Sequence, residues 1–166
     1  MSKENSSFVT EKLQEKFKSL KFDYSDYLGD ETIKINKDNL VSVITFLKNN
    51  SDLDFDMLVD MTCVDYMGDD ERFEMVYHLY SVKKNKRIRV KSRVSEDDVS
   101  IDSLVKLYKI ANWFEREVWD MYGIEFNGHP NLTRILLYEE FEGHPLRKDY
   151  PRLKEQPRIT FRDQEK

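Results

Sequence analysis

A pair of alternating segments, residues 73–80 and 87–94, constrains the fold more than any other feature of this chain. In the first segment every second residue is large and apolar: Phe73, Met75, Tyr77 and Leu79. The second segment alternates between Ile88, Val90, Ser92, Val94 and Arg87, Arg89, Lys91, Arg93. Because side chains of a strand alternate between its two faces, this pattern predicts a β-hairpin with one wholly basic face. That face either receives an acidic partner or meets water and protects a sheet edge, and we favour edge protection.

Helix and strand periodicities in the first half of the chain predict two helices and three further strands. Potential caps and the Leu28-Gly29-Asp30 turn separate them. The expected elements are a helix over 7–20, strands within 22–24, 32–35 and 58–66, and a helix that is capped by Asn36 or Asp38 and ends near residue 50.

A longer helix is predicted from about Asp102 to Tyr122, with Gly123 as its stop. Its apolar face comprises Leu104, Leu107, Tyr108, Ala111, Phe114, Val118 and Met121. The order helix, two strands, helix, three strands, helix predicts an α+β fold. We expect a two-layer domain with helices on one face of a mixed, roughly five-stranded sheet.

We expect residues 1–124 to form this domain and residues 125–166 to form an extended carboxy-terminal segment. All four prolines lie in that segment, which has little regular periodicity and little core of its own to bury. It either stays disordered or is ordered by lying along another protein. Its apolar side chains favour docking on a partner: Tyr138, Phe141, Leu146 and Tyr150.

Composition excludes several classes of protein. The net charge is −5, and the mildly basic second half (18 Lys/Arg against 15 Asp/Glu in residues 81–166) is too mixed to indicate nucleic-acid binding. A single cysteine, Cys63, excludes a four-cysteine iron–sulfur cluster or a multi-thiolate zinc site, and we expect it to be buried. No apolar run is long enough to span a membrane and no secretory signal is recognisable, so we expect a protein that folds in water.

The cluster from Trp113 to Gly123 is the densest group of charged and aromatic residues. Arg116 and Asp120 are four apart, so on a helix they can pair. Paired carboxylates could in principle do acid–base work. An arginine among acids lowers their pKa values, however, which favours permanent ion pairs over proton transfer near neutral pH.

The histidines His129 and His144 raise the question of a metal site. With Asp149 they could serve a stand-alone metal-dependent hydrolase. Their spacing matches no compact ligand motif, and each lies in a Gly-His-Pro turn, where the ring more often bonds to backbone. No glycine-rich phosphate loop or nucleophile elbow is present either.

Three stretches resemble the 30-kDa subunit of respiratory complex I, the NADH:quinone oxidoreductase. They are residues 111–124 (ANWFEREVWDMYGI), the run from Gly128 to Leu136, and residues 142–151 (EGHPLRKDYP). Upstream, Asp65-Tyr66 and residues 72–79 (RFEMVYHL) are similar to the central hairpin of that family.

The resemblance implies a cofactor-free member of a hetero-oligomer that carries electrons from NADH to quinone and translocates protons. It implies a structural and assembly role next to the quinone-site subunits, in the peripheral arm on the cytoplasmic side of the inner (plasma) membrane. Expected partners are the 49-kDa-type large subunit and cluster-bearing subunits, with FMN and iron–sulfur clusters on those partners. The equivalent subunit of a membrane-bound hydrogenase or other-donor dehydrogenase is the alternative.

The resemblance also implies which residues form or support the partner interface, while no catalytic, cofactor-binding or metal residue is expected. These are Trp113, Glu115, Arg116, Glu117, Asp120, Gly123, His129, Pro130, Arg134, His144, Pro145, Arg147, Lys148, Asp149 and Tyr150.

Overall fold

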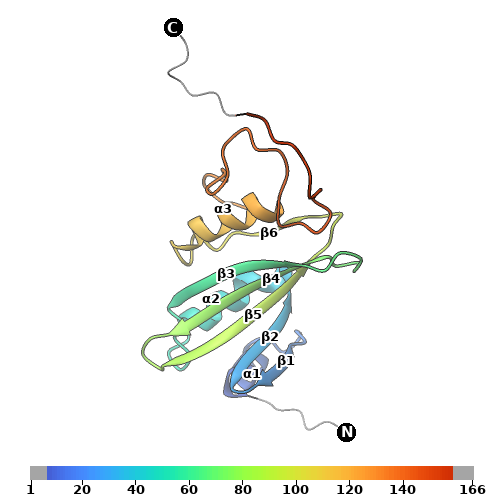
Figure 1. Ribbon diagram of the computed structural model, residues 1–166. Coiled ribbons are helices and arrows are strands. Elements are labelled where there is room, and N and C mark those ends of the chain that lie inside the picture. Colours follow the sequence, from blue (N-terminus) through green and yellow to red (C-terminus); the bar gives the residue numbers. More distant parts are fainter. Residues whose placement is uncertain (1–6, 159–166) are drawn as a thin grey trace.

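The computed structural model describes residues 7–158 (Figure 1). The helices are α1 (Phe8–Lys16), α2 (Leu40–Asn49) and α3 (Ala111–Tyr122), with a short 3-10 helix, η1 (Lys37–Asn39), before α2. The strands are β1 (Asp23–Tyr27), β2 (Asp30–Asn36), β3 (Met57–Asp65), β4 (Phe73–Ser81), β5 (Lys86–Val94), β6 (Ser100–Asp102) and β7 (Glu125–Asn127).

Five strands form one mixed sheet in the order β1-β2-β5-β4-β3. Only β2 and β5 run parallel, and the predicted hairpin of β4 and β5 is antiparallel. A separate two-stranded parallel sheet joins β6 to β7 and was not predicted. The boundary at residue 124 stays a prediction, although β7 lies just beyond it and pairs with the domain.

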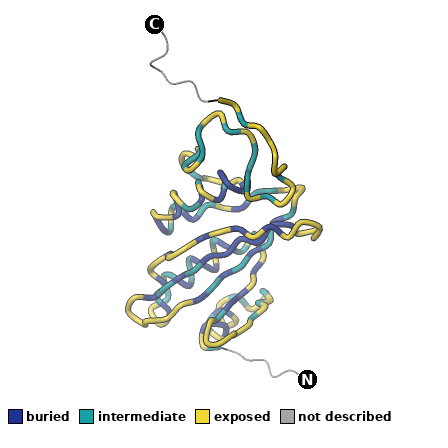
Figure 2. The backbone as a smooth tube through the Cα atoms, in the orientation of Figure 1, coloured by how far each residue is buried: buried dark blue, intermediate teal, exposed yellow. Residues whose placement is uncertain are grey.

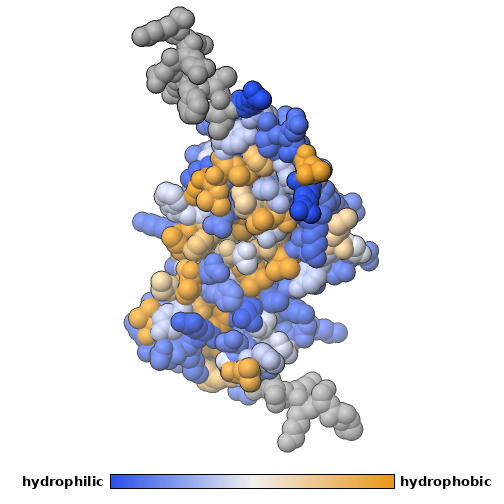
Figure 3. All heavy atoms as spheres, viewed as in Figure 1, coloured by the Kyte–Doolittle hydropathy of each residue, from blue (hydrophilic) through white to orange (hydrophobic). Residues whose placement is uncertain are grey.

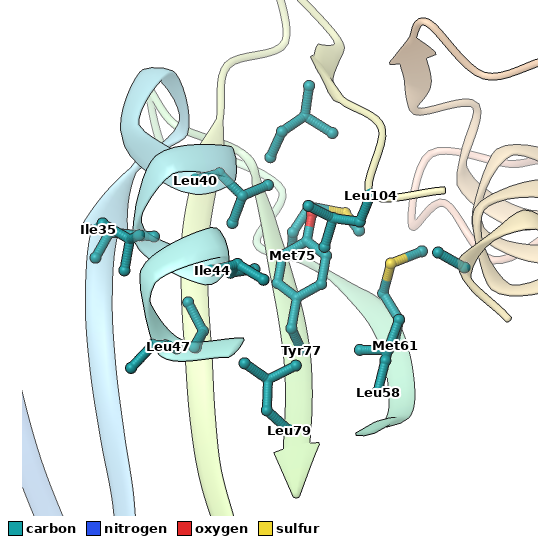
Figure 4. Packing of buried hydrophobic residues seen from close by; sticks show 14 of the residues in the cluster. Ile35, Leu40, Ile44, Leu47, Leu58, Met61, Met75, Tyr77, Leu79 and Leu104 are labelled. Atoms are coloured by element: carbon teal, nitrogen blue, oxygen red, sulfur yellow. The ribbon is translucent and has the colours of Figure 1, made fainter. Parts of the chain in front are cut away.

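One face of the sheet carries the core. Apolar residues of α2, among them Leu40, Ile44 and Leu47, face Met75 and Tyr77 of β4 (Figure 4). Strand β4 is buried or half-buried along its length, whereas β1 and many of the loops are mostly exposed (Figure 2). Cys63 is buried in this core, as predicted, and burial raises the pKa of its thiol to about 12. The two-layer α+β class is confirmed.

The interpretation of the basic strand as an edge protector is wrong. β5 lies between β2 and β4, and the sheet edges are β1 and β3. The parallel pairing of β2 with β5 joins segments more than fifty residues apart, which strand periodicity does not reveal. Lys91 and Arg93 instead bond the buried carboxylate of Glu74 on the neighbouring strand, at 2.7 and 3.1 Å.

The long helix predicted from Asp102 is shorter than expected. Residues 100–102 pair in β6, Leu104 to Tyr108 make a single turn, and α3 begins only at Ala111. The buried carboxylate of Glu115 explains the break, because it accepts hydrogen bonds from the Leu104 N–H and the Ser103 hydroxyl and so turns the chain back onto α3. Within residues 7–158 no helix has the length and hydropathy to cross a membrane.

Candidate functional site: a strap held on helix α3

The carboxy-terminal segment folds back on the last helix of its own chain. We define residues 128–158 as the strap. A helix leaves its last four carbonyls without helical partners. In α3 the Gly123 N–H bonds the first of these, Trp119 O, at 2.8 Å, and three strap residues bond the others. These bonds are His144 Nδ1 to Asp120 O (3.1 Å), Leu146 N–H to Met121 O (3.1 Å) and Arg147 Nε to Tyr122 O (2.5 Å).

The carboxylate of Asp120 is the central anchor of the strap and is completely buried. Its Oδ1 accepts from Arg134 Nη1 at 2.6 Å. Its Oδ2 accepts three consecutive backbone N–H groups, those of Ile135 (3.1 Å), Leu136 (2.9 Å) and Leu137 (2.9 Å). One helical side chain therefore holds four consecutive residues of the strap.

The charge of Asp120 is stabilised by these bonds. Burial by itself raises the pKa of the carboxyl, but the hydrogen bonds from Leu137, Arg134 and the neighbouring N–H groups outweigh it and hold the pKa below its ordinary value. The ionised form is the one that the strap recognises.

The predicted pairing of Arg116 with Asp120 is wrong. Arg116 points along the strap and donates to two of its carbonyls, Thr133 O at 3.0 Å and Arg134 O at 2.7 Å. Helical spacing made the pair possible, but Arg134 of the strap takes the carboxylate instead. The guanidinium of Arg116 also lies 5.9 Å from the ring centre of Trp113.

Arg134 links the first part of the strap to residues 141–143. Its Nη2 donates to Phe141 O at 2.7 Å and Gly143 O at 3.2 Å, while Nη1 holds Asp120. The guanidinium lies 5.6 Å from the ring centres of both Trp119 and Phe141. A planar fork with several donors suits this position better than a lysine would.

A second anchor, which the site prediction missed, is Arg72. It is 2% exposed and makes a forked pair with Asp65, with both bonds at 2.8 Å. The same guanidinium bonds Asp149 of the strap at 2.7 and 3.2 Å and Glu96 at 2.6 Å. Asp65 in turn accepts the Lys148 N–H at 2.8 Å. The strap is thus fastened to the start of β4 as well as to α3.

These contacts lower the pKa of both aspartates. For Asp65 and for Asp149, the hydrogen bond from Arg72 is the largest cause. In the sequence, Asp65 and Arg72 stand out only through the family resemblance. Their spacing of seven residues across a loop gives no periodic signal that they form a pair.

Glu115 departs from the expected pattern of lowered pKa values. It is fully buried, and burial raises its pKa to about 7, although the bonds from Ser103 and Leu104 lower it. Arg116, the next residue, turns toward the strap and bonds there instead. Glu115 therefore titrates near neutrality, in contrast to the expectation of low pKa values throughout this cluster.

Gly123 is required where the strap crosses the end of α3. Its φ of +74° is a left-handed conformation, and a Cβ there would lie 2.6 Å from Cδ2 of His144. The His144 ring packs edge-on against Trp119 with 6.1 Å between ring centres. Burial lowers the pKa of His144, so the neutral ring with a proton on Nδ1 fits this place.

The two histidines shape turns, as predicted, and do not converge. His129 bonds Asn112 O at 3.2 Å and accepts the Asn131 N–H at 3.1 Å, near the start of α3, whereas His144 lies at its end. Among residues 7–158 there is no group of three or more His, Cys, Asp or Glu side chains that could hold a metal ion.

The remaining residues of the predicted interface lie on or beside the strap. Tyr150 stacks on Phe141 with 6.2 Å between ring centres, and Pro145 is half-buried. Glu117 and Pro130 are exposed. Their role in an interface stays a prediction.

Large apolar side chains around the strap are left in water. The exposed fractions are 59% for Trp113, 62% for Leu136, 52% for Leu146 and 91% for Leu153. The polar groups that anchor the strap thus find partners within the chain, while several of its largest apolar groups do not. The sequence predicted that the strap finds its apolar and ionic partners on another protein, whereas Arg134 and Asp149 of the strap pair within the chain.

Comparison with known proteins agrees with this fold. Residues 33–156 match the family described as "Respiratory-chain NADH dehydrogenase, 30 Kd subunit". The chain is 46% identical over 151 residues to an NADH-quinone oxidoreductase subunit of Citrifermentans bemidjiense, covering 91% of each. It is 48% identical over 144 residues to the equivalent subunit of Trichlorobacter lovleyi, covering 86% of this chain and 88% of that one.

Two solved structures are similar. A trypsin-resistant fragment (1-134) of Nqo5 superposes with a TM-score of 0.66 at 28% identity, covering 75% of this chain and all of that one. A chain of the membrane-bound sulfane sulfur reductase, an archaeal respiratory membrane complex, gives a TM-score of 0.74 at 22% identity, covering 87% and 85%. The second likeness shows the shared fold alone.

The fold and the site define a class: a two-layer α+β domain whose carboxy-terminal strap is fastened to its last helix and its central sheet by buried ion pairs. Within that class the chain belongs to the family of the 30-kDa subunit of respiratory-chain NADH dehydrogenase.

Proposed function

We propose that this chain is a peripheral-arm subunit of a proton-translocating NADH:quinone oxidoreductase, with a structural and assembly role beside the quinone-site subunits. Family membership over residues 33–156 supports this, as does a relative named as an NADH-quinone oxidoreductase subunit and matched over 91% of this chain. The proposed neighbours are the 49-kDa-type large subunit and cluster-bearing subunits, on the cytoplasmic side of the membrane.

The observation that carries the docking role is the division of the strap into a satisfied polar side and an exposed apolar side. Arg134 of the strap pairs with Asp120, and Asp149 of the strap pairs with Arg72, so these ionic groups have partners within the chain. Trp113, Leu136 and Leu146 are then presented on a backbone that is already held in place. A preorganised apolar surface costs less entropy to dock than a flexible tail.

The proposed role is not catalytic, and the chain itself would carry no flavin or cluster. A protein-held cluster of the four-thiolate type needs four cysteines, and the only cysteine here is buried with a pKa raised to about 12. Glu115, Asp120 and His144 each bond to backbone groups of their own chain. In this proposal their bonds are structural.

The test is affinity purification of the tagged full chain from its native host, with neighbours identified by mass spectrometry. We expect an NADH-binding flavoprotein and a 49-kDa-type subunit, while nickel-bearing neighbours would favour the hydrogenase alternative. Recovery of the chain alone would refute the proposal.

A matched pair of variants tests the docking surface. Leu136→Ser removes an exposed side chain of the strap, and Leu28→Asn removes one that is 89% exposed on the distant β1–β2 turn. We expect only the first change to reduce recovery of the neighbours, with thermal unfolding unchanged in both. Equal recovery of the neighbours with the two variants would contradict a docking role for the strap, and it would leave the family assignment unchanged.

A further inference from the structure

No helix among residues 7–158 covers the second face of the five-stranded sheet (Figure 1). Met75, Tyr77 and Leu79 of β4 and their partners in β5 point toward α2, so the residues between them, Val76 included, point to the opposite face. In the view of Figure 1 the strands lie in front of α2, and Figure 3 shows hydrophobic and hydrophilic residues mixed across this side. Strand register places the residues of this face in rows, such as Thr32, Arg89 and His78.

One half of the open face is electrically balanced. Glu74 is 2% exposed and pairs with both Lys91 and Arg93. A cavity of about 660 Å³ opens beside these residues, and its lining includes both acids and bases. This half gives no preference for a partner of either sign.

The other half carries two arginines, Arg87 and Arg89, that form no ion pair with any residue from 7 to 158. Arg89 donates to the hydroxyl of Thr32 at 3.2 Å, and Arg87 lies 5.5 Å from the ring centre of Tyr80. Neither guanidinium has a carboxylate partner among residues 7–158. Stacking on an aromatic ring orients a guanidinium while leaving its edge N–H groups available for a carboxylate.

Exposed apolar side chains lie on β3, next to Tyr80 of this half. Met57 lies directly opposite Tyr80 in the register of β3 and β4 and is 48% exposed. Val59 is 42% exposed at the bulge two residues on. Arginine, tyrosine and methionine beside one another are the residue types enriched at the buried centres of protein interfaces.

We infer that the patch formed by Met57, His78, Tyr80, Arg87 and Arg89 is a second docking surface, and that its occupant is an acidic segment of a partner protein in the assembly. Carboxylates of that segment would pair with the two guanidinium groups, and an apolar side chain would cover Met57. The inference rests on the proposed function, because it assumes a hetero-oligomeric assembly.

Two other occupants fit the patch less well. A second copy of this chain related by two-fold symmetry about the patch would bring its arginines face to face with their own counterparts. Nucleic acid is disfavoured by Asp60, which lies opposite His78 within the same face, and by the net charge of −5.

The test compares two charge reversals of equal size in the full-length chain, purified with its complex from the host. One variant combines Arg87→Glu with Arg89→Glu. The control combines Lys18→Glu with Lys106→Glu, both of which lie in exposed positions outside the patch. Because like charges placed together weaken association strongly, we expect the first variant to lose at least roughly tenfold in recovery with the complex. The control should match wild type, and thermal unfolding should show that both variants fold.

A photo-crosslinking amino acid in place of Met57, followed by peptide mapping, identifies the occupant. An adduct with an acidic segment of another subunit supports the inference. An adduct with a second copy of this chain, with nucleic acid or with nothing overturns it, as does equal recovery of the two reversal variants. If wild type itself is recovered without a complex, the proposed function fails first, and the two failures are therefore distinct.

Discussion

Replacement of Asp120 by asparagine tests the central anchor of the strap. The change preserves shape but removes the negative charge and turns an N–H group toward the guanidinium of Arg134, which lies 2.6 Å from the carboxylate and is 13% exposed. Removing one partner of a buried ion pair costs about 3–5 kcal/mol, because the other charge stays buried. The three N–H groups on Oδ2 can still bond the amide oxygen of asparagine, so they do not increase this cost.

Hydrogen exchange at residues 135–137 measures this loss. With about 1.4 kcal/mol per factor of ten, these amides should exchange roughly a hundredfold to several thousandfold faster in Asp120→Asn, if they exchange by local opening of the strap. The control is Glu117→Gln, which neutralises a carboxylate on the same helix that takes no part in the anchor. Exchange in Asp120→Asn that matches the control would refute the claim that this carboxylate holds the strap.

The same anchor predicts a pH dependence. Since the folded pKa of Asp120 is lowered, its contribution is fully present above its ordinary value of 3.8 and is lost as pH falls through the folded pKa. Protection of residues 135–137 should therefore persist from neutral pH to about pH 4 and fail only in stronger acid. Loss of protection between about pH 5 and 7 would contradict this assignment.

Substitutions at Gly123, Glu115 and Arg72 test the other supports of the strap and of α3. Gly123→Ala should lower the unfolding midpoint more than Gly128→Ala, because both positions have positive φ but only the first would place a Cβ against a ring. Glu115 has a pKa raised to about 7, so wild type should lose roughly 3 kcal/mol of unfolding free energy relative to Glu115→Gln as pH rises from 4.5 to above 7, and denaturant titrations across that range measure the loss. In denaturant titrations Arg72→Met should cost about 3–5 kcal/mol, whereas Asp149→Asn, at a 43% exposed side chain, should cost under about 1 kcal/mol. Equal losses of unfolding free energy for the two substitutions would contradict the role of Arg72 as a buried anchor for several carboxylates.

Local patterns in the sequence determined the fold class and several structural details. The alternation in residues 73–94 specifies a hairpin because strand side chains alternate faces, whatever lies around them. Gly123 marks the end of α3 because only glycine enters a left-handed conformation without cost. The burial of Cys63 and the turns around His129 and His144 were likewise predictable from their neighbours in the chain.

Only the tertiary structure decided which strands and side chains pair and which carboxyl group has a raised pKa. β5 became an interior strand because β2 pairs with it across more than fifty residues, and Asp120 took Arg134 instead of the nearer Arg116. Glu115 rose in pKa because the packed core excludes water from it. Periodicity shows which face of an element is apolar. Pairing and desolvation depend on which distant segment covers that face, and the local pattern of residues does not show which segment that is.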